Sequence, residues 1–364
     1  MIVKEVIAVL EELAPLANAE GFDNVGLLVG NKQMEVSGVL VTLDTLENVV
    51  DEAIRKKCNL IVSFHPIIFG GLKKLTGASY VERVVIKAIE HRIAIYSMHT
   101  ALDNVPKGVN GKICEVLGLR NTRILIPKEK VIKKLTTYVP KDDADRLKDA
   151  LFSAGAGNIG KYSHCSFSTA GIGSYKAGKD AKPTKGTIGK THLEEEIQLH
   201  ITYTRAQEAE ILKALRKNHP YEEVAYEIIG LDNTDQQMGM GMIGELEQPM
   251  GEIAFFEFLK EKMQVSCIRH SQTLGKDIRT VAVLGGSGAF AIGAAKAQKA
   301  DIFISADIKY HQFYEAENKM VIADIGHYET EQFTKNLLVD YLTKKIPNFA
   351  VSLSESITNP IKYY

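Results

Sequence analysis

Two side chains near the C-terminus have the types and the spacing of metal ligands. His327 and Glu331 follow a short apolar run at 320–323 and are four residues apart. A helix that starts near His327 therefore places both on one face, where an imidazole and a carboxylate can bind a divalent metal ion. A surface hydrogen-bonded pair is the more common role at this spacing. The short connection from a buried strand favours the metal, because it brings both side chains to the strand's carboxyl end.

Three further candidates also follow apolar runs. His65 directly follows the run 59–64 and precedes a proline, which restricts the backbone there. Taken alone, this segment favours a partly buried histidine with satisfied hydrogen bonds. His99 and Asp103 follow the run 93–97. A loop aspartate that accepts backbone N–H bonds is the alternative for Asp103.

The four candidate ligands form a mixed nitrogen and oxygen set for a first-row divalent ion: His65, Asp103, His327 and Glu331. Zinc, manganese, iron and cobalt all remain open. A metal bound in this way lowers the pKa of its water and supplies hydroxide near neutral pH. The set therefore indicates metal-assisted hydrolysis as one chemistry for this chain.

Other polar residues could assist such a reaction. Asp307 and His311, again four residues apart, are candidates for orienting ligands or moving protons, as is His99. Gly286 and Ser287 precede a predicted helix, and their backbone N–H groups could hold an anion. A tight strand-to-helix turn explains the same glycines equally well. No Walker A or G-x-S-x-G motif is present.

Six short apolar runs must position these residues. They lie at 38–43, 59–64, 93–97, 280–284, 301–305 and 320–323, and their richness in Val and Ile predicts strands buried on both faces. Helix-like segments at 47–57, 81–91 and 289–299 alternate with them. This order predicts an α/β fold with largely parallel sheets flanked by helices. Polar residues at the carboxyl ends of such strands share a cleft, which here joins Asp44, His65, His99, Ser287, Asp307 and Asp324. For Asp44 and Ser287 alone, a turn or capping role is the default.

The middle of the chain has a different pattern of predicted elements. Residues 128–233 read as strand, helix, Gly-rich strands, helix and strand, which is the order of a ferredoxin-like α+β unit. We predict that this unit is a domain inserted into a surface loop of a discontinuous core domain, residues 1–127 and 234–364.

Composition restricts the function classes. Of 364 residues, 44 are Lys or Arg and 45 are Asp or Glu, so the net charge of −1 gives no support to DNA binding. No apolar stretch reaches the roughly 18 residues of a membrane span. The N-terminus resembles an amphipathic helix and not a signal peptide. The four cysteines are scattered without a C-x-x-C pair, which favours the reducing cytoplasm.

Several ordered segments resemble the signature blocks of the NGG-interacting-factor-three-like family. They are 21–30 (GFDNVGLLVG), 63–69 (SFHPIIF), 99–103 (HTALD), 305–311 (SADIKYH), 324–331 (DIGHYETE) and 356–361 (SITNPI). The insert resembles the CutA/PII-like domain of longer members, most clearly at 154–162 (AGAGNIGKY).

The resemblance implies a toroidal homohexamer with a two-metal site that faces an interior cavity. By motif, the ligands are His65, Asp103, His327 and a bridging Glu331. Members are often labelled GTP cyclohydrolase I type 2, which implies metal-dependent attack of water on the purine ring of GTP. The alternative is a non-enzymatic metal-binding or ligand-sensing regulatory hexamer, which the CutA/PII-like insert motivates.

One residue departs from the family pattern. Members usually have two adjacent histidines where this chain has Phe64 and His65. Phenylalanine cannot bind a metal, so one of the two metal positions loses a protein donor. We therefore expect one well-held metal ion, and a second that is weaker, differently coordinated or absent.

Overall fold

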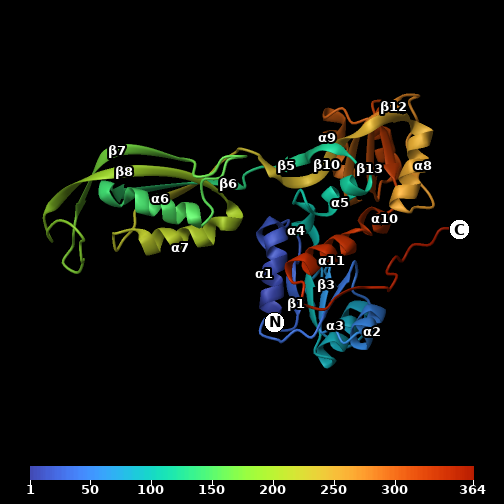
Figure 1. The fold of residues 1–364 in the computed structure, drawn as a ribbon, viewed down its shortest axis with the longest axis horizontal. Coiled ribbons are helices and arrows are strands. Elements are labelled where there is room, and N and C mark those ends of the chain that lie inside the picture. The colour runs from blue at the N-terminus through green and yellow to red at the C-terminus, as the bar shows by residue number, and fades with distance from the viewer. The chain divides into compact units, whose positions relative to one another are not determined.

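The computed structural model describes all residues from 1 to 364. The chain divides into two compact units (Figure 1). Unit 1 combines Met1–Pro127 with Gln236–Tyr364, and unit 2 is Lys128–Asp235. No helix combines the length and the apolar composition that crossing a membrane requires.

The first sheet of unit 1 has five strands in the order β1-β4-β3-β2-β15. Its strands are β1 (Gly26–Val29), β2 (Val39–Thr42), β3 (Leu60–Ser63), β4 (Ala94–Ser97) and β15 (Val351–Leu353). The strands from β4 to β15 are parallel, and β1 is an antiparallel edge strand. The associated helices are α1 (Val3–Leu13), α2 (Glu47–Arg55), α3 (Tyr80–Glu90), α4 (His99–Asp103) and α5 (Val109–Val116).

The second sheet of unit 1 has six strands in the order β11-β14-β13-β12-β10-β5. Its strands are β5 (Arg120–Lys128), β10 (Asp235–Gly251), β11 (Arg269–His270), β12 (Asp277–Ser287), β13 (Ile302–Ala306) and β14 (Val321–Asp324). The helices that follow β10 are α8 (Glu252–Met263), α9 (Ile292–Ala297), α10 (His327–Glu331) and α11 (Thr334–Lys345), of which α11 packs against β15 and β2 of the first sheet. Only β12, β13 and β14 are parallel, because β11 and β10 pair antiparallel with their neighbours. The second sheet is thus mixed, where the sequence predicts largely parallel pairing.

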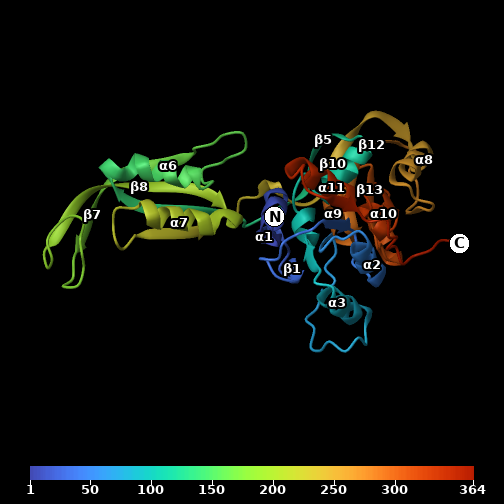
Figure 2. The ribbon, with the colours of Figure 1, turned by 60° about the horizontal axis from the view of Figure 1, so that its bottom comes forward.

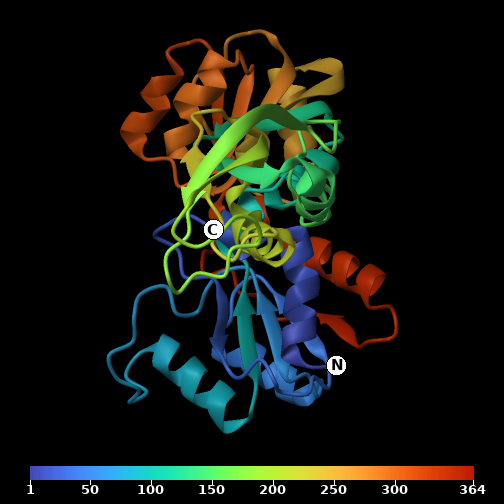
Figure 3. The same ribbon diagram turned by 90° about the vertical axis from the view of Figure 1, so that its left-hand side faces the viewer.

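The six predicted strands are all present, and each is buried on both faces. In β3, for example, Leu60 and Val62 join the central core while Ile61 joins an outer cluster with α2 and α3. In β13, Ile304 joins the same central core and Phe303 the outer cluster beside α9. The two sheets therefore share one core between them, and this core places their carboxyl ends close together. In Figure 3 the blue and cyan strands of the first sheet lie below the orange strands of the second.

Unit 2 has the order of elements that the sequence predicts. Its elements are β6 (Ile132–Pro140), α6 (Ala144–Ser153), β7 (Ser166–Lys176), β8 (Thr191–Thr204), α7 (Glu208–Asn218) and β9 (Tyr226–Gly230). The antiparallel sheet has the strand order β7-β8-β6-β9. Helices α6 and α7 lie side by side on one face of this sheet (Figures 1 and 2).

A buried carboxylate holds the end of the chain against the first sheet. Glu52 in α2 is 1% exposed and accepts hydrogen bonds from Ser354 Oγ at 2.8 Å and Ser356 Oγ at 2.7 Å. The backbone N–H groups of Glu355 and Ser356 donate to the same carboxylate, and Lys56 forms an ion pair with it. Burial alone would raise the pKa of Glu52, but these bonds outweigh burial and lower the pKa to about 2.

The Glu52 contacts predict an acid-dependent loss of stability. Because the folded-state pKa lies below the unfolded value, Glu52 stabilises the fold above about pH 4.5 and loses this effect as the pH falls toward its folded pKa. We expect Glu52→Gln to lower the free energy of unfolding by about 1–3 kcal/mol at pH 7. Urea unfolding between pH 7 and pH 3 should show this difference shrinking as the pH falls. A difference that is constant with pH would contradict the assignment.

Candidate metal centre

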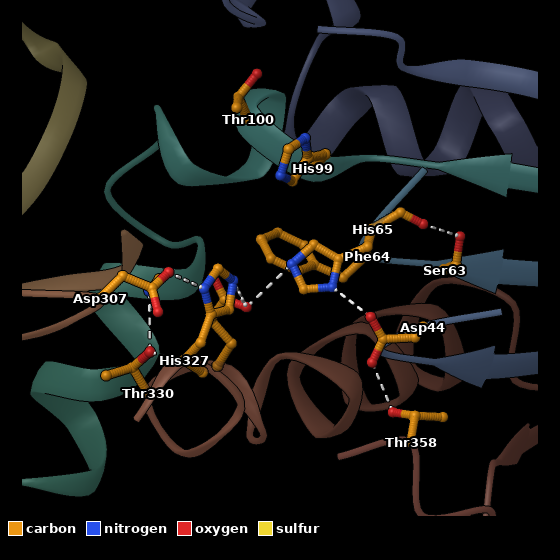
Figure 4. Close-up of polar contacts among 12 residues, drawn as sticks. Asp44, Ser63, Phe64, His65, His99, Thr100, Asp307, His327, Thr330 and Thr358 are labelled. Atoms are coloured by element: carbon orange, nitrogen blue, oxygen red, sulfur yellow. Dashed lines mark hydrogen bonds and ion pairs between the residues drawn. The ribbon is translucent and has the colours of Figure 1, made fainter. Parts of the chain in front are cut away.

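Three side chains converge where the carboxyl ends of the two sheets meet. One ligand atom from each of His65, His327 and Glu331 lies within 4.8 Å of the others. The Nε2 atom of His65 is 3.1 Å from Glu331 Oε2, and the Nε2 atom of His327 is 3.3 Å from the same oxygen (Figure 4). Three of the four predicted ligands thus form one cluster.

The backbone at the end of β3 holds His65 in place. The N–H groups of Phe64 and His65 both donate to the carbonyl oxygen of Leu43, at 3.1 and 2.9 Å. The hydroxyl of Ser63 donates to the His65 carbonyl at 2.8 Å. These bonds continue the β2–β3 pairing beyond the last strand residue, so His65 leaves the sheet in a fixed direction.

A glycine makes the turn that brings His327 and Glu331 to the site. Gly326 connects β14 to α10 with a φ of 98°, and a Cβ atom there would collide with the Glu329 carboxylate. Only glycine adopts this conformation without strain and fits the space. The one-turn helix α10 then places His327 and Glu331 on one face, as their spacing predicts. A Cβ atom on Gly286 would in turn collide with Glu331, so the second sheet leaves room for this carboxylate.

Each imidazole is oriented by a carboxylate behind it. His65 Nδ1 is 2.7 Å from Asp44 Oδ1, and His327 Nδ1 is 2.7 Å from Asp307 Oδ2. An Nδ1–H that donates to a carboxylate leaves the Nε2 lone pair free to bind a metal. The imidazoles of His65 and His327 lie beside each other (Figure 4), and both Nε2 atoms are within ion-pair distance of the same Glu331 oxygen. This is the arrangement of metal-binding histidines.

Two buried oxygens at the cluster have no hydrogen-bond partner. They are Oε2 of Glu331, which is 4% exposed, and Oδ1 of Asp103. The two imidazole nitrogens lie within ion-pair distance of Glu331, but neither has hydrogen-bond geometry to it. An unpaired buried polar atom costs about 1–3 kcal/mol, and more when it is charged. A divalent cation would compensate this negative charge, so the residues present fit a metal ion.

In the metal-free protein the cluster shifts its own pKa values. Burial lowers the pKa of His65, but Asp44 and Glu331 outweigh burial and raise it to about 10. Glu331 raises the pKa of His327 to about 9. Burial raises the pKa of Glu331, but His327 and His65 outweigh it and lower the pKa to about 2. Burial and the Glu331 charge raise the pKa of Asp103 well above its usual value.

A cavity of about 190 Å³ beside the cluster contains most of the other predicted residues. His99, Asp103, Gly286 and Ser287 line it together with His327 and Glu331. His99 Nδ1 is 2.8 Å from Asp23 Oδ1, so it too has an orienting carboxylate. The backbone N–H of Gly286 donates to Thr330 Oγ1 at 2.9 Å and is therefore not free to hold an anion.

The predicted proton-transfer residue His311 and the predicted cleft residue Asp324 lie apart from the cluster. His311 is in the 3-10 helix Tyr310–Ala316, where its ring contacts Tyr310 and Tyr314. Asp324 bonds the Arg269 side chain at 3.1 Å and the backbone N–H of Ile308 at 3.0 Å. The Asp324 carboxylate thus joins strand ends of its own sheet and does not reach the metal centre.

From the sequence, a turn or capping role is the default for Asp44, and neither Asp23 nor Thr358 is predicted as a site residue. Asp44 orients His65 and accepts a hydrogen bond from Thr358 at 2.6 Å. Asp23 orients His99. Sequence spacing alone does not show that Asp44 bonds His65, that Asp23 bonds His99, or that Thr358 bonds Asp44.

Comparisons with known proteins match one family over almost the whole chain. The family described as Duf34/NIF3 (NGG1p interacting factor 3) matches residues 1–360. A Bacillus subtilis relative called GTP cyclohydrolase 1 type 2 homolog is 37% identical, over 99% of this chain and 98% of its own length. The crystal structure of a Bacillus cereus protein related to NIF3 superposes with a TM-score of 0.83 at 34% identity, covering 100% and 99% of the two chains. Staphylococcus aureus protein SA1388 superposes with a TM-score of 0.79 at 30% identity, covering 100% and 99%.

The cluster predicts unusual histidine titrations in metal-free protein. His65 and His327 should remain protonated at pH 8, because Glu331 stabilises the charged imidazoles. In Glu331→Gln both pKa values should fall toward the ordinary histidine range. Side-chain ¹⁵N NMR of the metal-free protein measures both titrations. His219, whose pKa is lowered by burial in unit 2, serves as the unaffected internal control. Wild-type pKa values near 6.5 at both positions would refute the close contact with Glu331.

Proposed function

Because the chain belongs to the Duf34/NIF3 (NGG1p interacting factor 3) family, we propose that it is a divalent-metal-dependent hydrolase acting on a purine nucleotide. The name GTP cyclohydrolase 1 type 2 homolog, carried by its relatives, makes GTP the first substrate to test. The observation that carries the proposal is the convergence of two oriented imidazoles and one buried carboxylate on a single position.

In this proposal the residues of the cluster have distinct tasks. His65, His327 and Glu331 hold the metal, while Asp44 and Asp307 keep the two imidazoles in the metal-binding tautomer. A divalent metal at this position supplies a Lewis acid and lowers the pKa of water near neutral pH. All three ligands come from rigid strand ends or from α10, so the site is preorganised.

The cavity beside the cluster suits proton transfer. His99 lines it and is oriented by Asp23, so its Nε2 atom can accept or return a proton. Asp307 contacts only the outer side of His327 and therefore acts as its orienting group. At about 190 Å³, the cavity is smaller than the usual 300–1,000 Å³ of ligand sites. Only the reacting edge of a nucleotide enters it, and Ser287 at the exposed rim is the candidate phosphate contact.

Phe64 restricts the number of metals. Its fully buried ring has its centroid 4.9 Å from that of His65 and 5.5 Å from that of His99. It belongs to the central core, so no other side chain can take its place as a ligand without repacking. Asp103 is left as a buried carboxylate without a second nitrogen donor from this position. We infer one well-held ion per chain, of zinc, manganese, iron or cobalt.

The metal count tests this inference. Elemental analysis of protein purified without a metal-affinity tag should give about one metal ion per wild-type chain. Phe64→His should bind about two, because it adds a nitrogen donor beside His65 and His99. Phe64→Leu is the matched control, since it changes the core without adding a ligand. Two fully occupied metals in the wild type would contradict the role of Phe64.

A second function has a specific observation in its favour. Unit 2 contains a cavity of about 590 Å³ on its sheet, lined by residues that include Tyr138, Tyr175, Tyr221 and Glu196. A cavity of this size suits a small-molecule ligand. If the insert is a CutA/PII-like domain, as its resemblance implies, the protein is a regulatory one that binds metal and senses a ligand without turnover.

Turnover distinguishes the two functions. The hydrolase should consume GTP only when a divalent metal is present, and Glu331→Gln should reduce the rate at least 100-fold, because it removes a charged ligand. Chromatographic analysis of the nucleotide products measures this. Glu329→Gln, which alters the neighbouring carboxylate on α10, is the control. Metal binding without any conversion of GTP would favour the regulatory function.

We also propose that the protein acts in the cytoplasm as a homohexamer. All four cysteines are free, which fits a reducing compartment. Exposed aromatic side chains of unit 1, including Tyr310, Tyr314 and Phe290, are available for subunit contacts. Multi-angle light scattering gives the number of subunits, and a monomeric mass would contradict the proposal.

A further inference from the structure

The chain ends in a segment that is irregular yet partly buried. Residues 354–364 follow β15 and form neither helix nor strand. Even so, Ser354 is 2% exposed and Thr358 is 5% exposed. Chain termini are usually poorly ordered unless specific contacts hold them. The contacts that hold this segment in place therefore indicate its role.

Two carboxylates hold the segment on either side of Thr358. Upstream, Glu52 accepts bonds from Ser354, Glu355 and Ser356. Downstream, Asn359 Nδ2 donates to Glu329 Oε1 at 2.9 Å. Glu329 belongs to α10, the helix that carries His327 and Glu331. The segment thus extends from α2 beside the first sheet to the helix of the metal centre.

Thr358 lies at the point where this segment passes the metal centre. Its Oγ1 donates to Asp44 Oδ2 at 2.6 Å, while the other oxygen of Asp44 contacts His65 Nδ1 at 2.7 Å (Figure 4). Each carboxylate oxygen of Asp44 therefore has its own donor. A carboxylate bonded at both oxygens cannot rotate without breaking one bond, so Thr358 fixes the plane in which Asp44 meets the imidazole.

The hydroxyl of Thr358 has a different role from the other hydroxyls of the segment. Ser354 and Ser356 bond Glu52, which does not contact the metal cluster. Thr358 alone bonds a carboxylate that orients a ligand. Because the anchors on both sides already hold the segment, little conformational freedom remains to be lost when Thr358 binds Asp44.

We propose that Thr358 is a positioning residue of the metal centre, so that one hydroxyl of the C-terminal segment takes part in the metal site. Its hydroxyl orients Asp44, and Asp44 in turn orients the His65 imidazole toward the metal. This inference rests on metal binding at the proposed site, but it does not depend on the identity of the substrate. Because linkage is reciprocal, a segment that strengthens metal binding is itself held more firmly when the metal is bound.

Zinc affinity, measured by competition with a chromophoric chelator, tests the proposal on the full chain. Thr358→Val keeps the shape but removes the hydroxyl, and it should weaken zinc binding about 10-fold, at the lower end of effects seen for groups that orient ligands. Thr358→Ser keeps the hydroxyl and should bind zinc like the wild type. Ser356→Ala removes a bond to Glu52 and leaves the bond from Thr358 to Asp44 in place, so it should leave the affinity unchanged. In an Asp44→Asn background, Thr358→Val should have no further effect.

Hydrogen exchange gives a second readout that a purely structural role would not change. Zinc should slow amide exchange across 354–359 in the wild type and in Thr358→Ser, but not in Thr358→Val. Equal zinc affinity in wild type and Thr358→Val, or equal weakening in Ser356→Ala, would overturn the proposal while the metal site stands. A wild-type protein that binds no zinc, manganese, iron or cobalt would overturn the proposed function as well. Zinc binding without GTP turnover would leave the role of Thr358 intact.

Discussion

One carboxylate oxygen is shared by two imidazoles that belong to different sheets. Oε2 of Glu331 lies 3.1 Å from the His65 nitrogen and 3.3 Å from the His327 nitrogen. His65 follows the first sheet and the other two follow the second, so this contact exists only if both sheets are correctly placed. The shared core between the sheets supplies that placement, and the burial of Glu331 makes the electrostatic interactions strong. Each imidazole is in turn bonded through its Nδ1 atom, His65 to Asp44 and His327 to Asp307.

Much of this arrangement follows from local sequence patterns. The apolar runs predict the strands, and the four-residue spacing predicts that His327 and Glu331 share a face. The rule that ligands gather at the carboxyl ends of strands brings His65 to the same place. Local patterns do not show that the strands divide into two sheets, or that β10 and β11 pair antiparallel. They also fail for Asp44, whose partner Thr358 is 314 positions away along the chain. Only the assembled core determines that contact.

Phe64 shows how one position can serve the core and the site at once. It is fully buried in the central cluster, and its ring also contacts the imidazoles of His65 and His99. An apolar ring here excludes water from one side of the cluster and lowers the local dielectric constant, which strengthens the remaining ion pairs. In packing terms, the phenylalanine at this position contributes to the core. The chemistry of the site then depends on the cluster of His65, His327 and Glu331.

The route of the chain through the metal centre has a consequence for protein synthesis. His65 emerges from the ribosome well before His327, Glu331 and finally Thr358. The first four strands of the first sheet can pair while translation continues, but β15 and the segment behind Asp44 arrive last. A nascent chain therefore exposes His65 without its partners. In this fold, the cluster of His65, His327 and Glu331 can form only after α10 has been synthesised.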